Sequence, residues 1–217
     1  RAVGELDAAE AELAEAERLA RSCGLMLLLP RIAGNLAEIA LQREDWGAAE
    51  TRFSQAMAAA EASGDRKALA LTLGGAGDLA LLLGRMAAAD EHYARAEALF
   101  ASLGSRYVHG VRLHRATVRL LRGEPEAARL LAEFVATPGR DPLEVGLAQV
   151  GLALAAGQAG KWIAFDAGVA AAEQVLAQVG EARPVIVKLL RAAEAVARAA
   201  GEAERAGRTA ALAEAQT

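Results

Sequence analysis

The sequence has one cysteine, few aromatic residues and no long apolar run. Cys23 cannot close an intramolecular disulfide, and no second cysteine or nearby histidine stands at the spacing of a zinc site, so we expect it to be a small buried residue. The longest apolar runs, Leu25–Leu29 and Leu79–Leu83, are far below the roughly 20 residues that span a bilayer. No basic-then-apolar leader opens the chain. We therefore expect a cytoplasmic location and no membrane partner.

Aromatic residues make up only 4% of the 217 residues, whereas 54% are hydrophobic and about a quarter are alanine. A core of this kind requires close contact between small side chains, which helices with alanine seams provide and β-sandwiches do not. The formal net charge of −4 gives no global excess of positive charge for binding phosphate backbones, so we expect no nucleic acid contact. The composition predicts an all-α protein.

Residues that carry catalytic chemistry are also scarce. His109 and His114 have no carboxylate within five residues, so no general base pair is indicated. The cluster Gly74-Gly75-Ala76-Gly77 lacks the preceding strand and the following Lys-Ser/Thr of a phosphate loop, and we expect its glycines to let helices approach closely or to leave space in a groove. We expect no catalytic residue, no metal site and no cofactor, so the chain is not predicted to be an enzyme.

The chain resembles itself at a spacing of 40 residues. The segment Glu44–Ala49 recurs at Gly84–Ala89, and an earlier copy begins at Gly4. Weaker copies begin at Gly123, with Ala128 and Ala132, and at Gly160, with Phe165 and Ala172. In each clear copy an apolar residue, an alanine, a bulky residue and a second alanine follow at spacings of 3, 4 and 3, which is one face of a helix. Two of these series are Trp46, Ala49, Phe53, Ala56 and Met86, Ala89, Tyr93, Ala96.

A second set of helices is expected between these copies. The glycine that closes each copy fits a left-handed helix cap, which ends the helix and lets the chain reverse. Asp141-Pro142 supplies an N-cap and a first-turn proline for one of the intervening helices. The intervening first helices are expected at about 25–42, 66–83, 106–122, 142–158 and 184–200.

At these positions the sequence resembles a tetratricopeptide repeat array of the long-helix form, with a period near 40, that is common in large bacterial regulators. The family marks its second helix with Gly-x-aromatic-x-x-Ala-x-x-x-Phe-x-x-Ala, which the series from Gly84 to Ala96 follows. The resemblance implies a right-handed superhelical solenoid of antiparallel helix pairs over residues 1–217, with its clearest repeats at 4–104 and looser ones at 105–217. It also implies a non-catalytic protein interaction scaffold, as a module of a larger bacterial signalling or transcription-regulating protein.

In such a solenoid the first helices line a concave wall that binds a peptide or helix. On the first of these helices the facing stripe includes Arg31, Gly34 and Glu38. The wall residues expected to contact a partner are Leu71, Gly74, Asp78, Leu113, Thr117, Leu147, Val150 and Leu154. Three alternatives stay open: a helix of the same protein fills the groove, the array senses a small inducer, or the segment self-associates.

Arginines gather on the predicted helix at 106–122. Arg112, Arg115, Arg119 and Arg122 fall in one stripe with His109, and residues 66–140 carry 11 basic and 7 acidic side chains. The stripe either pairs internally, for instance with Glu124, Glu126 or Glu133, or binds an acidic partner or an anion.

Overall fold

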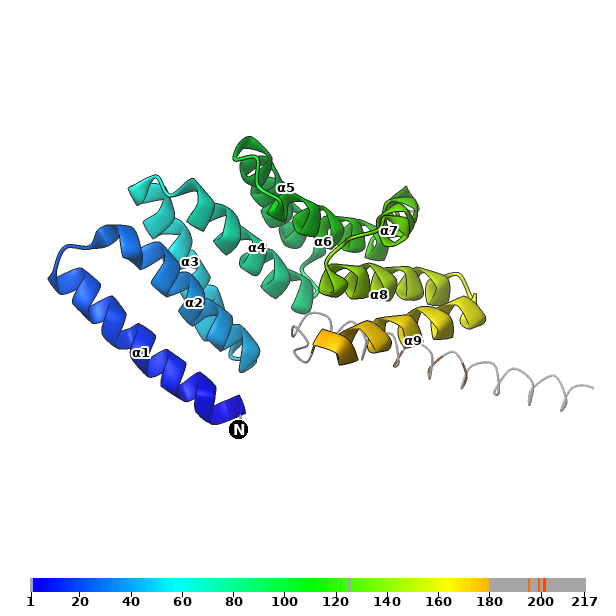
Figure 1. Ribbon diagram of the computed structural model, residues 1–217, viewed down its shortest axis with the longest axis horizontal. Coiled ribbons are helices and arrows are strands. Elements are labelled where there is room, and N and C mark those ends of the chain that lie inside the picture. The colour runs from blue at the N-terminus through cyan, green and yellow to red at the C-terminus, as the bar shows by residue number, and fades with distance from the viewer. Residues whose placement is uncertain (1, 125, 180–194, 196–198, 200, 202–217) are drawn as a thin grey trace, which may run out of the picture. The chain divides into compact units, whose positions relative to one another are not determined.

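The computed structural model describes residues 2–124, 126–179, 195, 199 and 201, and these form helices and no strand. Among the helices of residues 2–102, consecutive helices run in opposite directions and are joined by short turns (Figure 1). The all-α prediction is confirmed. The expected first helix at 184–200 lies almost wholly outside the described residues. In chain order the helices are α1 (Ala2–Ser22), a 3-10 turn η1 (Met26–Leu28), α2 (Leu29–Gln42), α3 (Trp46–Ser63), α4 (Arg66–Leu82), α5 (Met86–Ser102), α6 (Tyr107–Leu121), α7 (Glu126–Ala136), α8 (Pro142–Gln158) and α9 (Trp162–Val179).

The chain divides into two compact units, residues 1–118 and 119–217. In the first unit, α2 packs on α3, α3 on α4 and α4 on α5, and the two first helices α2 and α4 also touch. In the second unit, α8 packs between α7 and α9. Each unit therefore repeats the same antiparallel pairing. A single array over residues 1–217 stays a prediction.

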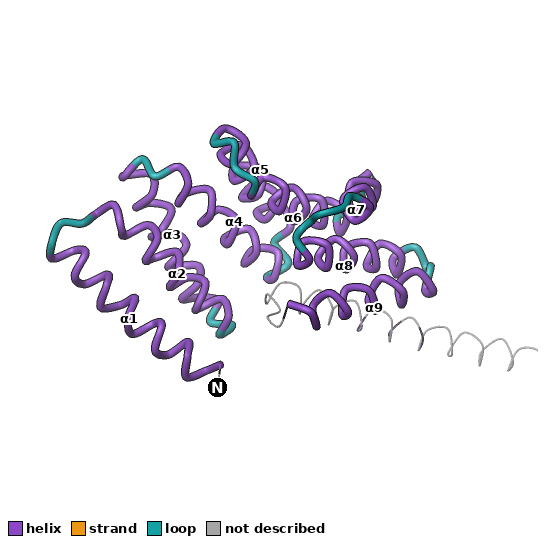
Figure 2. Tube along the Cα trace, in the orientation of Figure 1, coloured by secondary structure: helices purple, strands orange, loops and turns teal. Residues whose placement is uncertain are grey.

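Local capping sets the helix ends. Asp45 and Asp65 are N-caps whose carboxylates accept from the backbone N–H of Ala48 at 3.0 Å and of Ala68 at 2.9 Å. Gly64 ends α3 in the left-handed conformation at φ 71°, which costs glycine no strain. Figure 2 draws the turns in teal: those leading into α2, α4 and α6 follow one edge of the first unit, and those after α2 and α4 lie opposite.

Alanines and glycines bring the helices into close contact. Ala49 and Ala89 are fully buried, as the repeated pattern predicts. Each second helix also presents one ring to a glycine of α4. A Cβ on Gly75 would lie 2.5 Å from Cε1 of Phe53, and a Cβ on Gly77 would lie 2.6 Å from Cε1 of Tyr93. These two glycines have the close-approach role that the sequence suggested for their cluster.

The start of α2 differs from the expectation. The α-helix begins at Leu29, with Pro30 in its first turn, and Met26–Leu28 form a short 3-10 turn instead of continuing the helix back to residue 25. Proline suits a first helical turn because it has no N–H to leave unpaired. Cys23 lies in the turn before this segment and is exposed, so the prediction of a buried cysteine is wrong.

The weaker copy at Gly123 is out of register by one residue. Its alanines were expected to be Ala128 and Ala132, but α7 buries Ala127, Leu131 and Phe134. The copy at Gly160 is in the expected register, because Phe165 and Ala172 are buried on α9 as predicted. A shift of one residue turns a helix face by about 100°, which is enough to exchange a buried alanine for an exposed one.

Candidate functional site

The exposed faces of α2 and α4 lie side by side in the first unit. A Cβ on Gly34 of α2 would lie 3.7 Å from Oγ1 of Thr72 on α4, which measures how closely the two helices approach. We call the surface above this contact the α2–α4 wall. Its exposed or half-buried residues are Arg31, Gly34 and Glu38 from α2 with Lys67, Leu71, Gly74 and Asp78 from α4.

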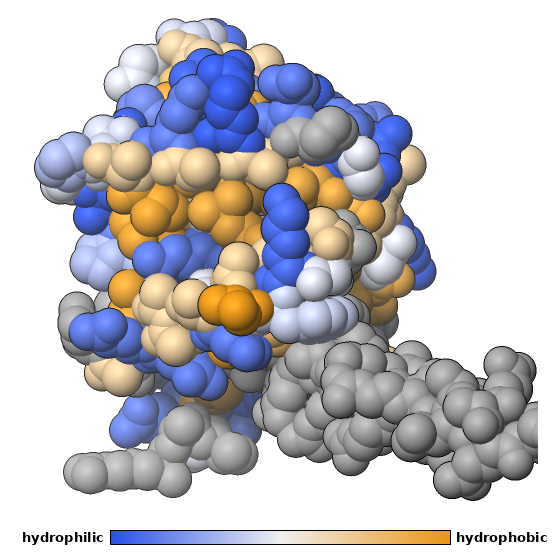
Figure 3. Space-filling model, turned by 90° about the vertical axis from the view of Figure 1, so that its right-hand side faces the viewer, coloured by the Kyte–Doolittle hydropathy of each residue, from blue (hydrophilic) through white to orange (hydrophobic). Residues whose placement is uncertain are grey.

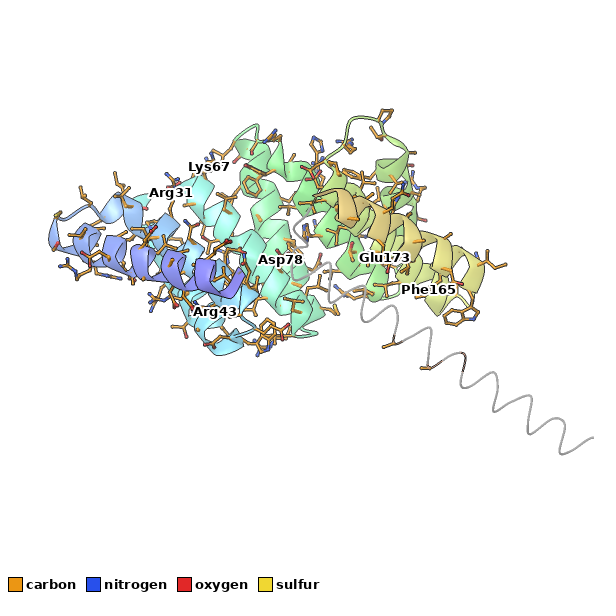
Figure 4. All side chains as sticks on the ribbon, turned by 60° about the horizontal axis from the view of Figure 1, so that its bottom comes forward. Arg31, Arg43, Lys67, Asp78, Phe165 and Glu173 are labelled. Atoms are coloured by element: carbon orange, nitrogen blue, oxygen red, sulfur yellow. The ribbon has the colours of Figure 1, made fainter. Side chains whose placement is uncertain are left out.

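Charge is graded along this wall. Arg31 and Lys67 lie near the N-terminal ends of their helices, where the helix dipoles add further positive potential. Glu38 and Asp78 lie two to three turns farther along the same helices, and Figure 4 labels Arg31 and Lys67 close together with Asp78 at a distance from them. Among the described residues, neither Arg31 nor Lys67 is part of an ion pair. The wall is therefore positive at one end and negative at the other.

The middle of the wall is apolar and carries little side-chain bulk. Leu71 is 46% exposed, which is high for a leucine in a helix array. A Cβ added at Gly74 would meet nothing within 4 Å, so this glycine leaves open space beside the leucine. This differs from Gly75 and Gly77 on the same helix, which are filled by aromatic rings. The wall thus presents an exposed leucine beside the open space at a glycine.

Asp78 is held in a polar contact between three helices. Its Oδ1 accepts a 2.6 Å hydrogen bond from the Tyr93 hydroxyl of α5 and lies 3.1 Å from Nδ1 of His114 on α6. The Tyr93 and His114 rings lie with their centroids 5.4 Å apart. Sequence reasoning missed this group. The available signal was that Tyr93 stands where the previous copy has Phe53, because a buried tyrosine hydroxyl requires a partner.

The other expected wall residues are not open to a groove. All five are buried, and they are Leu113 and Thr117 on α6 with Leu147, Val150 and Leu154 on α8. Helix α6 instead exposes its arginine-bearing face. Helix α8 carries no charged residue between Glu144 and Lys161, and a helix that is apolar all round is covered on most sides. The placement of these five residues on an accessible wall is therefore corrected, and contact with a partner stays a prediction for Leu71, Gly74 and Asp78.

The arginine stripe of α6 is paired within the chain. Arg112 donates to Glu97 at 2.8 Å, and Arg115 donates to Asp90 at 2.8 Å and to Glu97 at 3.2 Å. The hydrogen bonds to Asp90 and Glu97 raise the pKa of the Arg115 guanidinium above its ordinary value. The α5 carboxylates were not among the partners suggested by the sequence.

The remaining two arginines of the stripe share one carboxylate. Arg119 donates to Glu124 at 2.7 Å, and Arg122 lies 3.9 Å from the same carboxylate. Glu124 was one of the expected partners, so internal pairing is the interpretation that the contacts support. Charge neutralised in this way is less available for an acidic partner or an anion.

The described part of the second unit exposes its large apolar side chains singly. Ile163 on α9 is 89% exposed and Leu130 on α7 is exposed as well, and they lie on different helices. Figure 3 shows the face where α8 and α9 lie in Figure 1, with apolar residues (orange) in a band across its middle and polar ones (blue) above and below. Single exposed residues such as Ile163 and Leu130 are ordinary on a protein surface and indicate no binding site.

Part of the chain is similar to a known family of repeats, and its fold is similar to a solved structure. Residues 28–102, which cover α2 to α5, match the family model of the tetratricopeptide repeat. Tetratricopeptide repeats are therefore shown for this segment, about a third of the chain. The crystal structure of BtubC (BKLC) from P. vanneervenii is similar over 82% of this chain and 92% of that chain, with 18% sequence identity and a TM-score of 0.50. At that identity the likeness supports the fold alone. No curated protein matches the chain.

The family assignment agrees with the position of the wall. The matched segment contains both helices that form it, α2 and α4, as the first helices of consecutive repeats. Tetratricopeptide repeats in general mediate protein–protein interaction, so a protein partner is the class of ligand that the family supports. The residues of the wall then determine which partner chemistry fits.

Proposed function

We propose that this segment is a non-catalytic interaction module that holds a peptide or a helix of a partner protein on the α2–α4 wall. The observation that carries the proposal is Leu71, a leucine 46% exposed beside the open space at Gly74. An apolar side chain of the partner packs against Leu71 in this open space. Burying one leucine side chain contributes about 1.5 to 3 kcal/mol, enough to determine the strength of a micromolar interaction.

The two charged ends give the bound segment a direction. Arg31 and Lys67 favour carboxylates of the partner, and the exposed Glu38 favours its lysines or arginines. A segment that runs the opposite way places like charges together at both ends. The preferred partner is therefore an amphipathic segment with acidic residues at one end, an apolar centre and basic residues at the other.

The module serves, in this proposal, as the regulatory part of a larger bacterial signalling or transcription-regulating protein in the cytoplasm. The support is the family match together with the absence of catalytic chemistry in the sequence. Repeats of one fold bind unrelated partners, so the flanking domains and the wall residues decide the specific role.

The experiment places a photoreactive residue at position 71 and, as a matched control, at Ala98, which is exposed on the second helix α5. We expect the probe at 71 to capture a discrete partner in cells and the probe at 98 to capture none of it. Changing Arg31 and Lys67 together to Glu should abolish the capture while leaving the helicity unchanged. Leu71→Asp should weaken the same interaction about 10-fold to 150-fold.

Three outcomes would contradict the proposal. Capture of the same proteins from both probe positions would mean that the wall binds no partner specifically. Capture of a second copy of this chain would assign the wall to self-association. Binding unchanged by the reversal of both basic residues would remove the charge argument.

A further inference from the structure

One edge of the first unit is both apolar and basic. It is formed by the turns that lead into α2, α4 and α6, which follow one another along the same side of the unit (Figure 2). We call it the turn edge. It lies at the ends of the helices and shares the cations Arg31 and Lys67 with the α2–α4 wall, but none of its apolar residues is part of that wall.

The first of these turns exposes four large apolar side chains in a row. Leu25, Met26, Leu27 and Leu28 are between 45% and 68% exposed, and Leu27 is the most exposed of them. The third turn adds the exposed side chains of Leu103 and Tyr107. Elsewhere in the described part of the chain, exposed large apolar residues are separated along the sequence. A contiguous row of this kind on a protruding turn calls for something to cover it.

The charges around the row are mostly basic. The sequence contains no acidic residue between Glu17 and Glu38, and Arg31 falls in that interval. Arg18 and Arg21 fall there too, but they are paired with Glu15 and Glu17 of α1, so Arg31 is the arginine of this turn without an ion pair among the described residues. The second turn carries Arg66 and Lys67.

The third turn continues the same pattern. It carries Arg106, whose guanidinium carbon lies 5.8 Å from the centre of the Tyr107 ring. The carboxylate of the second turn, Asp65, is directed to the backbone N–H of Ala68, where it caps α4. The edge therefore presents cations on either side of exposed leucines.

We propose that the turn edge binds the surface of a lipid bilayer that contains anionic headgroups. Leu25–Leu28 enter the boundary between headgroups and acyl chains, and Arg31, Arg66, Lys67 and Arg106 contact the headgroups. Interfacial binding of this kind combines a few buried apolar side chains with attraction to anionic lipid. Tyr107, apolar in its ring and polar at its hydroxyl, suits the same boundary.

A bilayer fits these observations better than a second copy of the chain. Two copies that meet edge to edge, related by a twofold axis, would bring the same cations face to face. They would also need a hollow to receive each protruding row, whereas a fluid bilayer accepts apolar side chains without one. The expectation of no membrane partner was based on the length of the apolar runs, which concerns spanning. Among the described residues no helix is long and apolar enough to cross a membrane, and the contact inferred here requires none.

The test measures sedimentation of the whole chain with lipid vesicles. Vesicles of phosphatidylcholine alone are compared with vesicles that also contain phosphatidylserine, at low and at high salt. We expect binding to the anionic vesicles that weakens as salt is added. Leu27→Asp should reduce the partition coefficient about 30-fold, equivalent to about 2 kcal/mol. Reversing Arg66 and Arg106 to Glu should weaken binding to the anionic vesicles and leave the weak binding to phosphatidylcholine unchanged.

Two control variants make the result specific. Leu130→Asp changes an exposed leucine on α7, outside the edge, and should bind vesicles as the unmodified protein does. Leu71→Asp removes the apolar centre of the wall and should also leave vesicle binding unchanged, so the turn edge and the proposed function fail independently. All four variants should melt at similar temperatures, since the replaced side chains are exposed.

Several results would overturn the inference. The first is no binding to anionic vesicles at low salt, and the second is an equal loss for Leu27→Asp and Leu130→Asp. A dimer whose mass depends on concentration and which Leu27→Asp dissolves would assign the edge to a second copy. A protein partner that Leu27→Asp releases, in the absence of any vesicle binding, would assign it to that protein.

Discussion

Gly77 and Gly74 lie one turn apart on α4 and are expected to respond in opposite ways to the same substitution. A Cβ at Gly77 would lie 2.6 Å, 2.7 Å and 2.9 Å from three atoms of the Tyr93 ring, all closer than Cβ contacts normally come. A Cβ at Gly74 would touch nothing within 4 Å. The change to alanine is chemically identical at both positions, so the difference between the variants isolates the packing of the ring.

The magnitude depends on whether Tyr93 can move away. The ring is 1% exposed, its hydroxyl donates to Asp78 at 2.6 Å, and it packs against the ring of His114. Because the ring is held on three sides, overpacking should fall near the upper end of the usual 1 to 3 kcal/mol. Alanine returns about 1 kcal/mol of helix propensity at either position. We expect Gly77→Ala to lose about 2 kcal/mol and Gly74→Ala to gain up to about 1 kcal/mol.

Thermal unfolding followed by far-ultraviolet circular dichroism measures the difference. For a chain of this size about 3 kcal/mol corresponds to a gap of roughly 6 to 12 °C between the melting temperatures of the two variants. In a double-mutant cycle, the cost of Gly77→Ala should shrink when Tyr93 is changed to Leu, because the clashing ring atoms are gone. Equal melting temperatures for the two glycine variants, or a cost that persists without the ring, would refute this reasoning.

Three further predictions use the same stability assay. Ala89→Leu should cost about 1 to 3 kcal/mol because Ala89 is fully buried, whereas Ala98→Leu on the exposed face of α5 should change stability by less than about 0.5 kcal/mol; equal effects would contradict the repeat alignment. Arg115→Glu should lower the free energy of unfolding by about 1 to 2 kcal/mol, because it breaks two ion pairs. An unchanged melting temperature would mean that the ion pairs of the stripe add nothing to stability. Burial lowers the pKa of His92, so the folded state favours the neutral imidazole. The unfolded chain binds a proton more readily, and the free energy of unfolding therefore decreases as the pH falls below about 6.5 and is unaffected by this group above it. His92→Gln should flatten that decrease, and a pH profile identical to that of the unmodified protein would exclude this histidine as its source.

The sequence by itself determined the elements and their pairing. Helix starts at Asp45, Asp65 and Asp141 depend on a side chain reaching a backbone N–H two or three residues away, so they can be predicted from neighbours alone. The buried alanines Ala49 and Ala89 follow from a repeated pattern, because equivalent positions in stacked copies meet equivalent surroundings.

Only the tertiary structure decided which faces stay open. Leu71 and Leu113 were both expected on the groove wall, yet Leu71 is exposed and Leu113 is buried, because coverage depends on neighbouring helices and not on the helix's own pattern. The pairing of Arg115 with Asp90 joins residues 25 apart on different helices, and local spacing cannot reveal such a contact. The row Leu25–Leu28 is exposed for the same kind of reason. A run of leucines predicts burial from composition, but here it lies in a turn whose four large apolar side chains stay exposed.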